Sequence, residues 1–240
     1  MSALLIIPAY NEAGRIETVL QGIAATGTDC RVVVVDDGSQ DGTGDIARRL
    51  GVTVLQHPFN LGYGAALQTG YKFALHAGAD VVVQMDADGQ HDPADIHELL
   101  QLIRDDRHDL VVGSRFLEIS GYRMGMVRRI GRWVFSRLAR LAGVRVSDPT
   151  SGFQALNRRV LEVYAEDFFP NDYPDVDVLV AAFRNGLRVG EHPVHMSEGT
   201  RASSLHGGLR PIYYVYKMML STWSASARVR PRNRAAGGSR

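Results

Sequence analysis

The sequence predicts an α/β fold with a mostly parallel sheet flanked by helices, and three observations support this prediction. Short apolar runs rich in β-branched residues alternate with helix-like segments along the first half of the chain. The runs are apolar throughout, which is typical of strands buried on both faces of a parallel sheet. Polar, glycine-containing clusters follow the runs, and ligands of parallel sheets bind at this position, beyond the carboxyl ends of the strands. The 240 residues are 45% apolar and 22% charged, enough for a full core in one domain.

The elements are predicted in chain order from their periodicity and end signals. In the first half, strands are expected at 4–7, 32–35, 52–55, 81–85 and 110–112, and helices near 16–23, 46–50, 61–77 and 93–104. Asp92 is the expected cap of the last of these helices. Beyond residue 116 the alternation is less regular, with helices expected at 124–141, 176–184 and 209–223 and extended segments at 152–156 and 187–194. The crossovers between parallel strands should be right-handed.

Composition narrows the class of protein. Cys30 is the only cysteine, which excludes an internal disulfide and thiol-rich metal sites. The start of the chain lacks the features of a signal peptide, and no run of about 18 apolar residues predicts a spanning helix. We therefore expect a cytoplasmic protein that is soluble or peripheral to a membrane. The net charge of +1 by itself says nothing about a nucleic-acid or acidic partner, and no nucleic-acid partner is expected. Carboxylates gather at 36–45 and 80–95, whereas 119–147 holds seven arginines and no acid, so one region suits a cation and another suits anions.

A candidate metal site follows the fourth predicted strand. Asp86 and Asp88 are two residues apart on an extended segment, so they share a face that Gln90 extends. Two such carboxylates repel each other unless a cation joins them or one binds a proton. Oxygen ligands suit Mg²⁺ or Mn²⁺, which usually bridge protein and substrate phosphates. The alternative is a polar turn in which Asp92 caps the next helix and His91 is a turn residue.

Three further clusters follow strands or precede a helix. Asp36–Thr43 offers carboxylates that would accept hydrogen bonds from a base or ribose, although Ser39 or Asp41 could instead cap the next helix. Tyr10 could stack on a base, and the glycine turn 60–66 leads into a helix with a small, close-packing face. Neither a dinucleotide fingerprint after the first strand nor a P-loop is present.

Taken together, these segments resemble the family 2 glycosyltransferases of the GT-A fold, in particular the dolichyl-phosphate mannosyltransferase-like, polyprenyl-phosphate branch. The resemblance runs from about residue 3 to about 220. It is carried, in order, by IPAYNE (7–12), VDDGSQDGT (35–43), NLGYGAAL (60–67), MDADGQH (85–91), VGSR (112–115) and DPTSGFQAL (148–156). It implies one domain over 1–227, with a nucleotide-sugar-binding half at 1–118 and an acceptor and interface half at 119–227, followed by a basic, disordered tail at 228–240.

The resemblance also implies roles for individual residues. The donor would be bound by Pro8, Ala9, Tyr10, Glu12, Asp37, Asp86, Ala87 and Asp88. The divalent ion, Mg²⁺ or Mn²⁺, would be held by Asp86, Asp88 and Gln90. Catalysis would depend on Asp88, Arg115 and Arg201, and the acceptor would be bound by Arg132 and Ser136. Tyr63 and the loop at 201–206 depart from the pattern of the mannosyltransferases, which leaves the donor sugar open.

The implied reaction is an inverting transfer from a UDP- or GDP-sugar to a lipid phosphate at the cytoplasmic face of a membrane. Peripheral contact is expected through amphipathic helices at 124–141 and 209–223, or through a membrane-anchored partner protein. Both helices could instead pack on the sheet. One rival is a soluble hydroxyl acceptor, for which Asp177 could be the general base or merely a helix N-terminal carboxylate. Another is a sugar-phosphate nucleotidyltransferase.

Overall fold

The structure is a computed structural model that describes residues 1–117, 126–172 and 174–196, with the backbone alone for 126–132. The predicted helix at 209–223, the tail at 228–240 and Arg201 lie outside the described residues. The part of the predicted acceptor half beyond residue 196 also lies outside them. The division of the domain into two halves stays a prediction.

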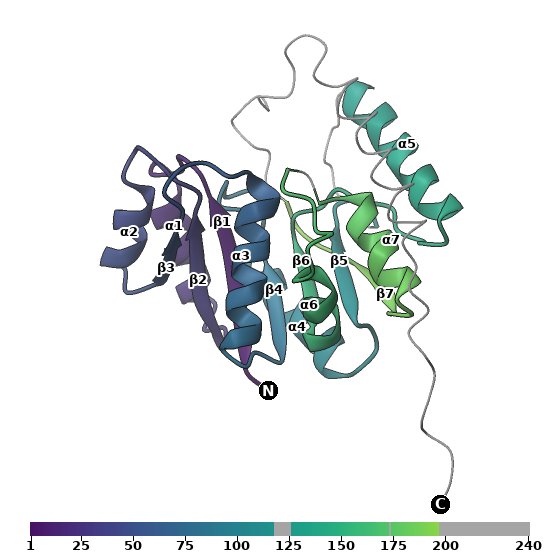
Figure 1. Cartoon of the computed structure of the whole chain (residues 1–240), viewed down its shortest axis with the longest axis horizontal. Coiled ribbons are helices and arrows are strands. Elements are labelled where there is room, and N and C mark those ends of the chain that lie inside the picture. Colours follow the sequence, from purple (N-terminus) through teal and green to yellow (C-terminus); the bar gives the residue numbers. More distant parts are fainter. Residues whose placement is uncertain (118–125, 173, 197–240) are drawn as a thin grey trace, which may run out of the picture.

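The described strands form one seven-stranded sheet with the order β3-β2-β1-β4-β6-β5-β7 (Figure 1). The pairs β1–β2, β1–β4, β2–β3 and β5–β7 are parallel, whereas β6 runs antiparallel to both β4 and β5. The prediction of a mostly parallel sheet is therefore confirmed. The strands are β1 Ala3–Ala9, β2 Cys30–Asp36, β3 Thr53–Gln56, β4 Val81–Gln84, β5 Leu110–Ser114, β6 Gln154–Asn157 and β7 Val189–Pro193.

Helices cover both faces of this sheet, and the alternation of side chains along β1 shows how. Leu4 and Ile6 pack in the core beneath α3, α5, α6 and α7, whereas Leu5 and Ile7 pack in the opposite core beneath α1 and α4. The helices are α1 Ile16–Ala25, α2 Thr43–Arg49, α3 Tyr63–His76, α4 Ile96–Arg104, α5 Met126–Leu141, α6 Arg158–Tyr164 and α7 Val176–Arg184. Within the described residues, no helix is long and apolar enough to cross a membrane.

Two elements differ from the sequence prediction. The predicted helix at 93–104 begins as a 3₁₀ turn, Pro93–Asp95, and Asp92 caps it by accepting a hydrogen bond from Ala94 N at 2.9 Å. The short helix α6 was not predicted. Its cap is Asn157, the last residue of β6, whose side chain accepts from Val160 N. Because β6 turns directly into α6, no polar turn signals a boundary between them.

The sheet order places a ligand edge beside β1. Its neighbours β2 and β4 lie on opposite sides, so the direction of the crossovers reverses there. Ligands of open α/β sheets bind beyond the carboxyl ends of the strands at such a switch point. The clusters predicted to bind the donor follow β1, β2 and β4 at this edge.

Candidate active site

Asp86 follows β4 and has Tyr63, His91 and Gly152 as close neighbours. Tyr63 Oη donates a hydrogen bond to Asp86 Oδ1 at 2.7 Å, and His91 Nε2 lies 3.5 Å from Oδ2. A Cβ atom added to Gly152 would lie 2.3 Å from Asp86 Oδ2, so only glycine fits against this carboxylate. Burial by itself raises the pKa of Asp86, but His91, the Tyr63 hydroxyl and the charge of Arg115 outweigh it and lower the pKa. Asp86 is therefore ionised at neutral pH.

Asp88 has the opposite electrostatic environment. Its oxygens accept hydrogen bonds from Gln90 N at 3.0 Å and Gln90 Nε2 at 2.7 Å. Burial and the charges of Asp86 and Glu12 raise the pKa of Asp88. The two carboxylates are thus close enough to repel each other, as predicted, and Glu12 from the loop after β1 adds to the negative charge.

This negative charge and the oxygen ligands fit a divalent cation. No group of three His, Cys, Asp or Glu side chains in the described part of the chain would hold a metal by itself. Asp86, Asp88 and the amide oxygen of Gln90 would supply only part of a coordination shell. Mg²⁺ and Mn²⁺ commonly complete such a shell with water and substrate phosphate oxygens.

The loops after β1 and β2 form one hydrogen-bonded unit at the donor side of this site. Four backbone amides connect them: Asp37 N to Ala9 O at 2.9 Å, Asn11 N to Ser39 Oγ at 3.0 Å, Glu12 N to Thr43 Oγ1 at 2.9 Å and Ala13 N to Asp41 Oδ2 at 3.0 Å. Ser39 and Asp41 therefore hold the loop that carries the predicted donor residues. Asp41 also accepts from Thr43 N and so supports the start of α2, whose N-cap is Gly42.

Asp37 builds the turn that leads into α3. Its buried carboxylate lies 2.7 Å from His57 Nδ1 and accepts hydrogen bonds from Leu61 N and Gly62 N, each at 2.9 Å. Both oxygens thus have protein partners. The predicted contact of Asp37 with the base or ribose stays a prediction, and the geometry adds a structural role.

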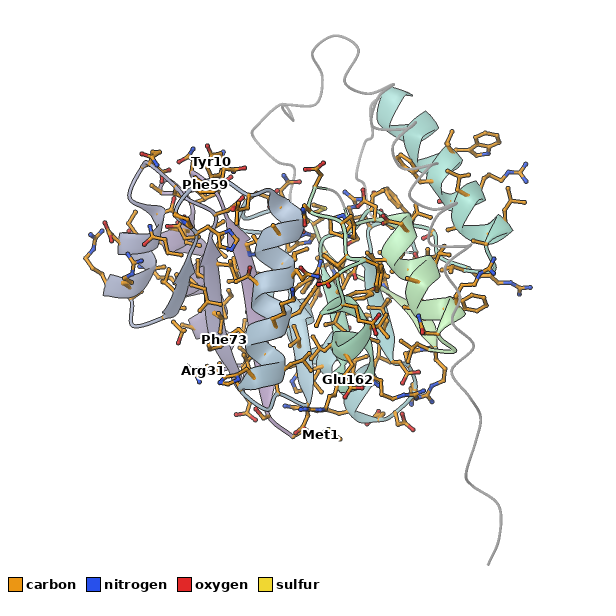
Figure 2. All side chains as sticks on the ribbon, in the orientation of Figure 1. Met1, Tyr10, Arg31, Phe59, Phe73 and Glu162 are labelled. Atoms are coloured by element: carbon orange, nitrogen blue, oxygen red, sulfur yellow. The ribbon has the colours of Figure 1, made fainter. Side chains whose placement is uncertain are left out.

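Two aromatic side chains are exposed at this end of the sheet. Tyr10 is 47% exposed and Phe59 is 62% exposed (Figure 2). The neighbours of Tyr10 are bonded to Asp37 and Ser39, and a Cβ on Gly38 would lie 2.5 Å from the backbone of Phe59. Both residues therefore flank the turn at Gly38. Tyr10 was predicted to be a donor residue. Phe59 was not, and its only signal was an aromatic residue in a polar turn.

Arg115 is held by a fully buried partner. Its Nε and Nη2 atoms form two hydrogen bonds to Asp148, both at 2.6 Å. The charge of Arg115 lowers the pKa of Asp86, so the predicted phosphate-binding arginine lies on the same side of the site as that carboxylate. Asp148 N in turn donates to Glu191 Oε1 on β7 at 3.0 Å. The loop before β6 thus orients Arg115.

The predicted acceptor residues lie on α5 beside the same loop. Ser136 Oγ donates to Ser147 O at 3.0 Å, next to Asp148. The backbone of Arg132 is one helical turn before Ser136, but its side chain is outside the described residues. Asp177, considered as a general base, is buried and accepts from Asp175 N and Val178 N at the start of α7. These contacts support its alternative role as a helix N-terminal carboxylate.

Paired carboxylates, a glycine contact and an arginine thus meet at the carboxyl edge of an α/β sheet, and sequence comparison gives the class of the protein. Residues 4–165 match the family model described as glycosyl transferase family 2. The chain belongs to this family.

Curated relatives at similar identity act on polyprenyl phosphates, according to their names. The UDP-N-acetylglucosamine–dolichyl-phosphate N-acetylglucosaminyltransferase of Methanococcus voltae is 34% identical over 79% of this chain and 83% of its own. The polyprenol monophosphomannose synthase of Mycolicibacterium smegmatis is 34% identical over 81% of this chain and 77% of its own. The undecaprenyl-phosphate mannosyltransferase of Micrococcus luteus is 34% identical over 87% of this chain and 89% of its own.

Solved structures confirm the GT-A fold. Glucosyl-3-phosphoglycerate synthase from Mycobacterium tuberculosis, in complex with Mn²⁺, UDP and glucosyl-3-phosphoglycerate, superposes with a TM-score of 0.69. The two chains are 21% identical, and the alignment covers 96% of this chain and 81% of that one. The same synthase has also been solved with Mg²⁺ and UDP.

Proposed function

We propose that the protein is a divalent-metal-dependent, inverting glycosyltransferase that moves a sugar from a nucleoside-diphosphate sugar to a polyprenyl phosphate. The observation that carries the proposal is the gathering of Asp86, Asp88 and Glu12 at the carboxyl edge of the sheet, where burial and the charges of Asp86 and Glu12 raise the pKa of Asp88. A cation bound there would relieve the repulsion and attract a diphosphate. The names of the relatives support the lipid phosphate as acceptor.

The donor would lie across the edge formed by β1, β2 and β4. Tyr10 and Phe59 would supply aromatic surface for the base, since both are exposed beside the turn at Gly38. Pro8 and Ala9 at the end of β1, and Glu12 in the loop that follows, would contact the nucleoside. Asp86, Asp88 and Gln90 would hold the cation and, with Ala87, border the diphosphate.

The chemistry requires charge stabilisation on the leaving group. A bound Mg²⁺ or Mn²⁺ would supply Lewis-acid neutralisation of the departing nucleoside diphosphate. Arg115, oriented by Asp148, would add a fixed positive charge near Asp86. Arg201 would add a second, as the family resemblance implies. The site would therefore stabilise the negative charge that develops on the departing diphosphate more strongly than it binds the intact donor.

The acceptor phosphate would need no strong general base. A phosphate monoester has a second pKa near 6, so it is mostly ionised at neutral pH and is already a nucleophile. Arg132 and Ser136 on α5 would hold it. The contacts of Asp177 at the start of α7 are consistent with a reaction that does not use this carboxylate as a base.

The exposed face of α5 supports contact with a bilayer. Trp133 is 60% exposed and Leu141 is 85% exposed, while Phe135 and Ala139 on the opposite face are buried. The Arg137 guanidinium lies 5.2 Å from the Trp133 ring centre. Aromatic and aliphatic groups mixed with arginines suit the headgroup region of an anionic membrane. We assign this contact to the cytoplasmic face, made directly or through a membrane-anchored partner.

The test is product analysis with labelled donors. The purified protein, Mn²⁺ and a panel of UDP- and GDP-sugars are incubated with a polyprenyl phosphate in anionic vesicles. We expect labelled sugar in the lipid fraction and free nucleoside diphosphate. Transfer only to water-soluble acceptors would favour the soluble-acceptor rival. Release of pyrophosphate would favour a nucleotidyltransferase, and both results would contradict the proposal.

A further inference from the structure

Tyr63 connects two parts of the site that lie far apart in the sequence. It is the first residue of α3, and its hydroxyl donates to Asp86 Oδ1 at 2.7 Å. A tyrosine hydroxyl has an ordinary pKa of about 10, so it carries its proton at neutral pH and is the donor in this contact. The contact is thus a charge-assisted hydrogen bond, which is stronger than one between neutral groups.

The backbone that carries Tyr63 is held from two directions. On one side, Asp37 accepts from Leu61 N and Gly62 N. On the other side, Gly62 has a φ of +105°, and a Cβ there would lie 2.7 Å from Asn171 O. Asn171 O also accepts from Ala65 N at 3.0 Å. The start of α3 therefore has little freedom to shift, and the Tyr63 ring is directed by a rigid support.

Asp86 has few other fixed contacts. His91 Nε2 is 3.5 Å from Oδ2, longer than a normal hydrogen bond, and neither ring nitrogen of His91 has a hydrogen-bond partner among the described residues. Gly152 limits the space on the far side but donates nothing to Asp86. The hydroxyl of Tyr63 is therefore the short contact that selects one orientation of the carboxylate.

We propose that Tyr63 is a positioning residue for the donor site, which holds the Asp86 carboxylate through its hydroxyl so that it faces the cation and the diphosphate. This inference rests on the proposed function. Preorganised groups bind a ligand more tightly because they lose less freedom on binding. Removing the hydroxyl should weaken cation and nucleotide binding even though the protein stays folded.

Tyr71 provides a matched control on the same helix. Tyr71 is buried, whereas Tyr63 is half-buried, and the Tyr71 hydroxyl donates to the side chain of Gln84 rather than to Asp86. Tyr71→Phe removes the same atom from the same helix. A purely structural effect of losing a buried hydroxyl should appear in both variants, whereas positioning of Asp86 should be lost only in Tyr63→Phe.

The experiment measures the binding of Mn²⁺ in the presence of UDP, from the electron paramagnetic resonance signal of free Mn²⁺. We expect Tyr63→Phe to bind Mn²⁺ with UDP about tenfold more weakly than the wild type, and Tyr71→Phe to stay within about twofold. Thermal unfolding without metal checks that both variants fold. Equal affinity of Tyr63→Phe and wild type, or equal losses in both variants, would overturn the inference.

A double-mutant cycle tests whether Tyr63 acts through Asp86. If it does, Tyr63→Phe combined with Asp86→Asn should bind Mn²⁺ no more weakly than Asp86→Asn alone. Losses that simply add would overturn the positioning role, and this cycle also decides the case if Tyr63→Phe is less stable than expected. A wild-type protein that binds no Mn²⁺ with UDP would overturn the proposed function as well, which distinguishes the two failures.

Discussion

Gly152 lies directly against the Asp86 carboxylate, so close that a Cβ atom at position 152 would be 2.3 Å from Oδ2 and 2.6 Å from Oδ1. The two residues come from different parts of the chain, one after β4 and the other before β6. The antiparallel pairing of these strands brings them together. A glycine in the DPTSGFQ segment thus shapes the predicted metal site without contributing a functional group.

Gly152→Ala is expected to displace the Asp86 side chain and to weaken Mn²⁺ binding in the presence of UDP by about tenfold or more, because a misplaced ligand loses its preorganisation. The affinity is measured from the concentration of free Mn²⁺ during a titration of the protein with Mn²⁺ in the presence of UDP. The control is Gly22→Ala in α1, where a Cβ would meet only Pro93 Cγ at 3.5 Å, an ordinary contact. That substitution should leave Mn²⁺ binding unchanged. Normal binding by Gly152→Ala would contradict the close contact.

The two aspartates should affect stability in opposite directions when no metal is bound. The pKa of Asp86 is lowered in the folded protein, so its ionised form stabilises the fold at neutral pH, and this stability is lost as the pH falls through the folded pKa. The pKa of Asp88 is raised, so its contribution is fully present below its unfolded pKa and is lost as the pH rises through the folded pKa.

At neutral pH, Asp86→Asn should therefore lower the free energy of unfolding, by roughly 1–3 kcal/mol, whereas Asp88→Asn should raise it. Denaturant unfolding in EDTA at pH 7 and near pH 4 measures both effects, and both differences should shrink at the lower pH, where the carboxylates approach their ordinary pKa of about 4. A destabilised Asp88→Asn variant at pH 7 would contradict the electrostatic description of the site.

Phe59 should contribute to nucleotide affinity through its exposed ring. Phe59→Ala is expected to weaken UDP binding about tenfold, since stacking on a base is worth about 1–3 kcal/mol. Inorganic pyrophosphate lacks a base, so its binding in the presence of Mn²⁺ should be unaffected. Phe183→Ala is the matched control, because Phe183 is 42% exposed on α7. Equal effects on UDP and pyrophosphate would show that Phe59 does not contact the base.

The exposed face of α5 should bind anionic bilayers. Trp133→Ser combined with Leu141→Ser removes the two most exposed apolar side chains among those that the structure describes on α5. The double variant should reduce co-sedimentation with phosphatidylglycerol vesicles severalfold at low salt. Leu50→Ser, at the end of α2, is a suitable control because Leu50 is 39% exposed. Unchanged co-sedimentation of the double variant would rule out this surface as the contact.

The fold was largely predictable because its signals are local. Uniformly apolar runs such as Val32–Val35 predicted buried parallel strands, and the structure extends that run to Cys30–Asp36. Boundaries differ by at most three residues, since apolar periodicity fades where strands enter polar turns. The antiparallel direction of β6 depends on where α5 returns the chain to the sheet, and no local pattern specifies that direction.

The site was predictable as residue types but not as contacts. The spacing of Asp86 and Asp88 predicted a shared face, which stays a prediction, and burial together with the nearby charge of Asp86 raises the pKa of Asp88. The partners that distinguish the two, Tyr63 and Gly152, lie in the NLGYGAAL and DPTSGFQAL segments, but no sequence pattern indicated that either would contact Asp86. The same holds for Asp148, whose buried pairing with Arg115 depends on the packing of two loops.

The most direct test of the central claim is calorimetric titration of UDP into the wild type and Asp88→Asn, each with Mn²⁺ and with EDTA. The predicted result is UDP binding by the wild type that requires Mn²⁺ and is abolished or reduced about a hundredfold in Asp88→Asn. UDP binding that is equally tight in EDTA, or unchanged by Asp88→Asn, would show that the carboxylate pair does not hold a cation that binds the diphosphate.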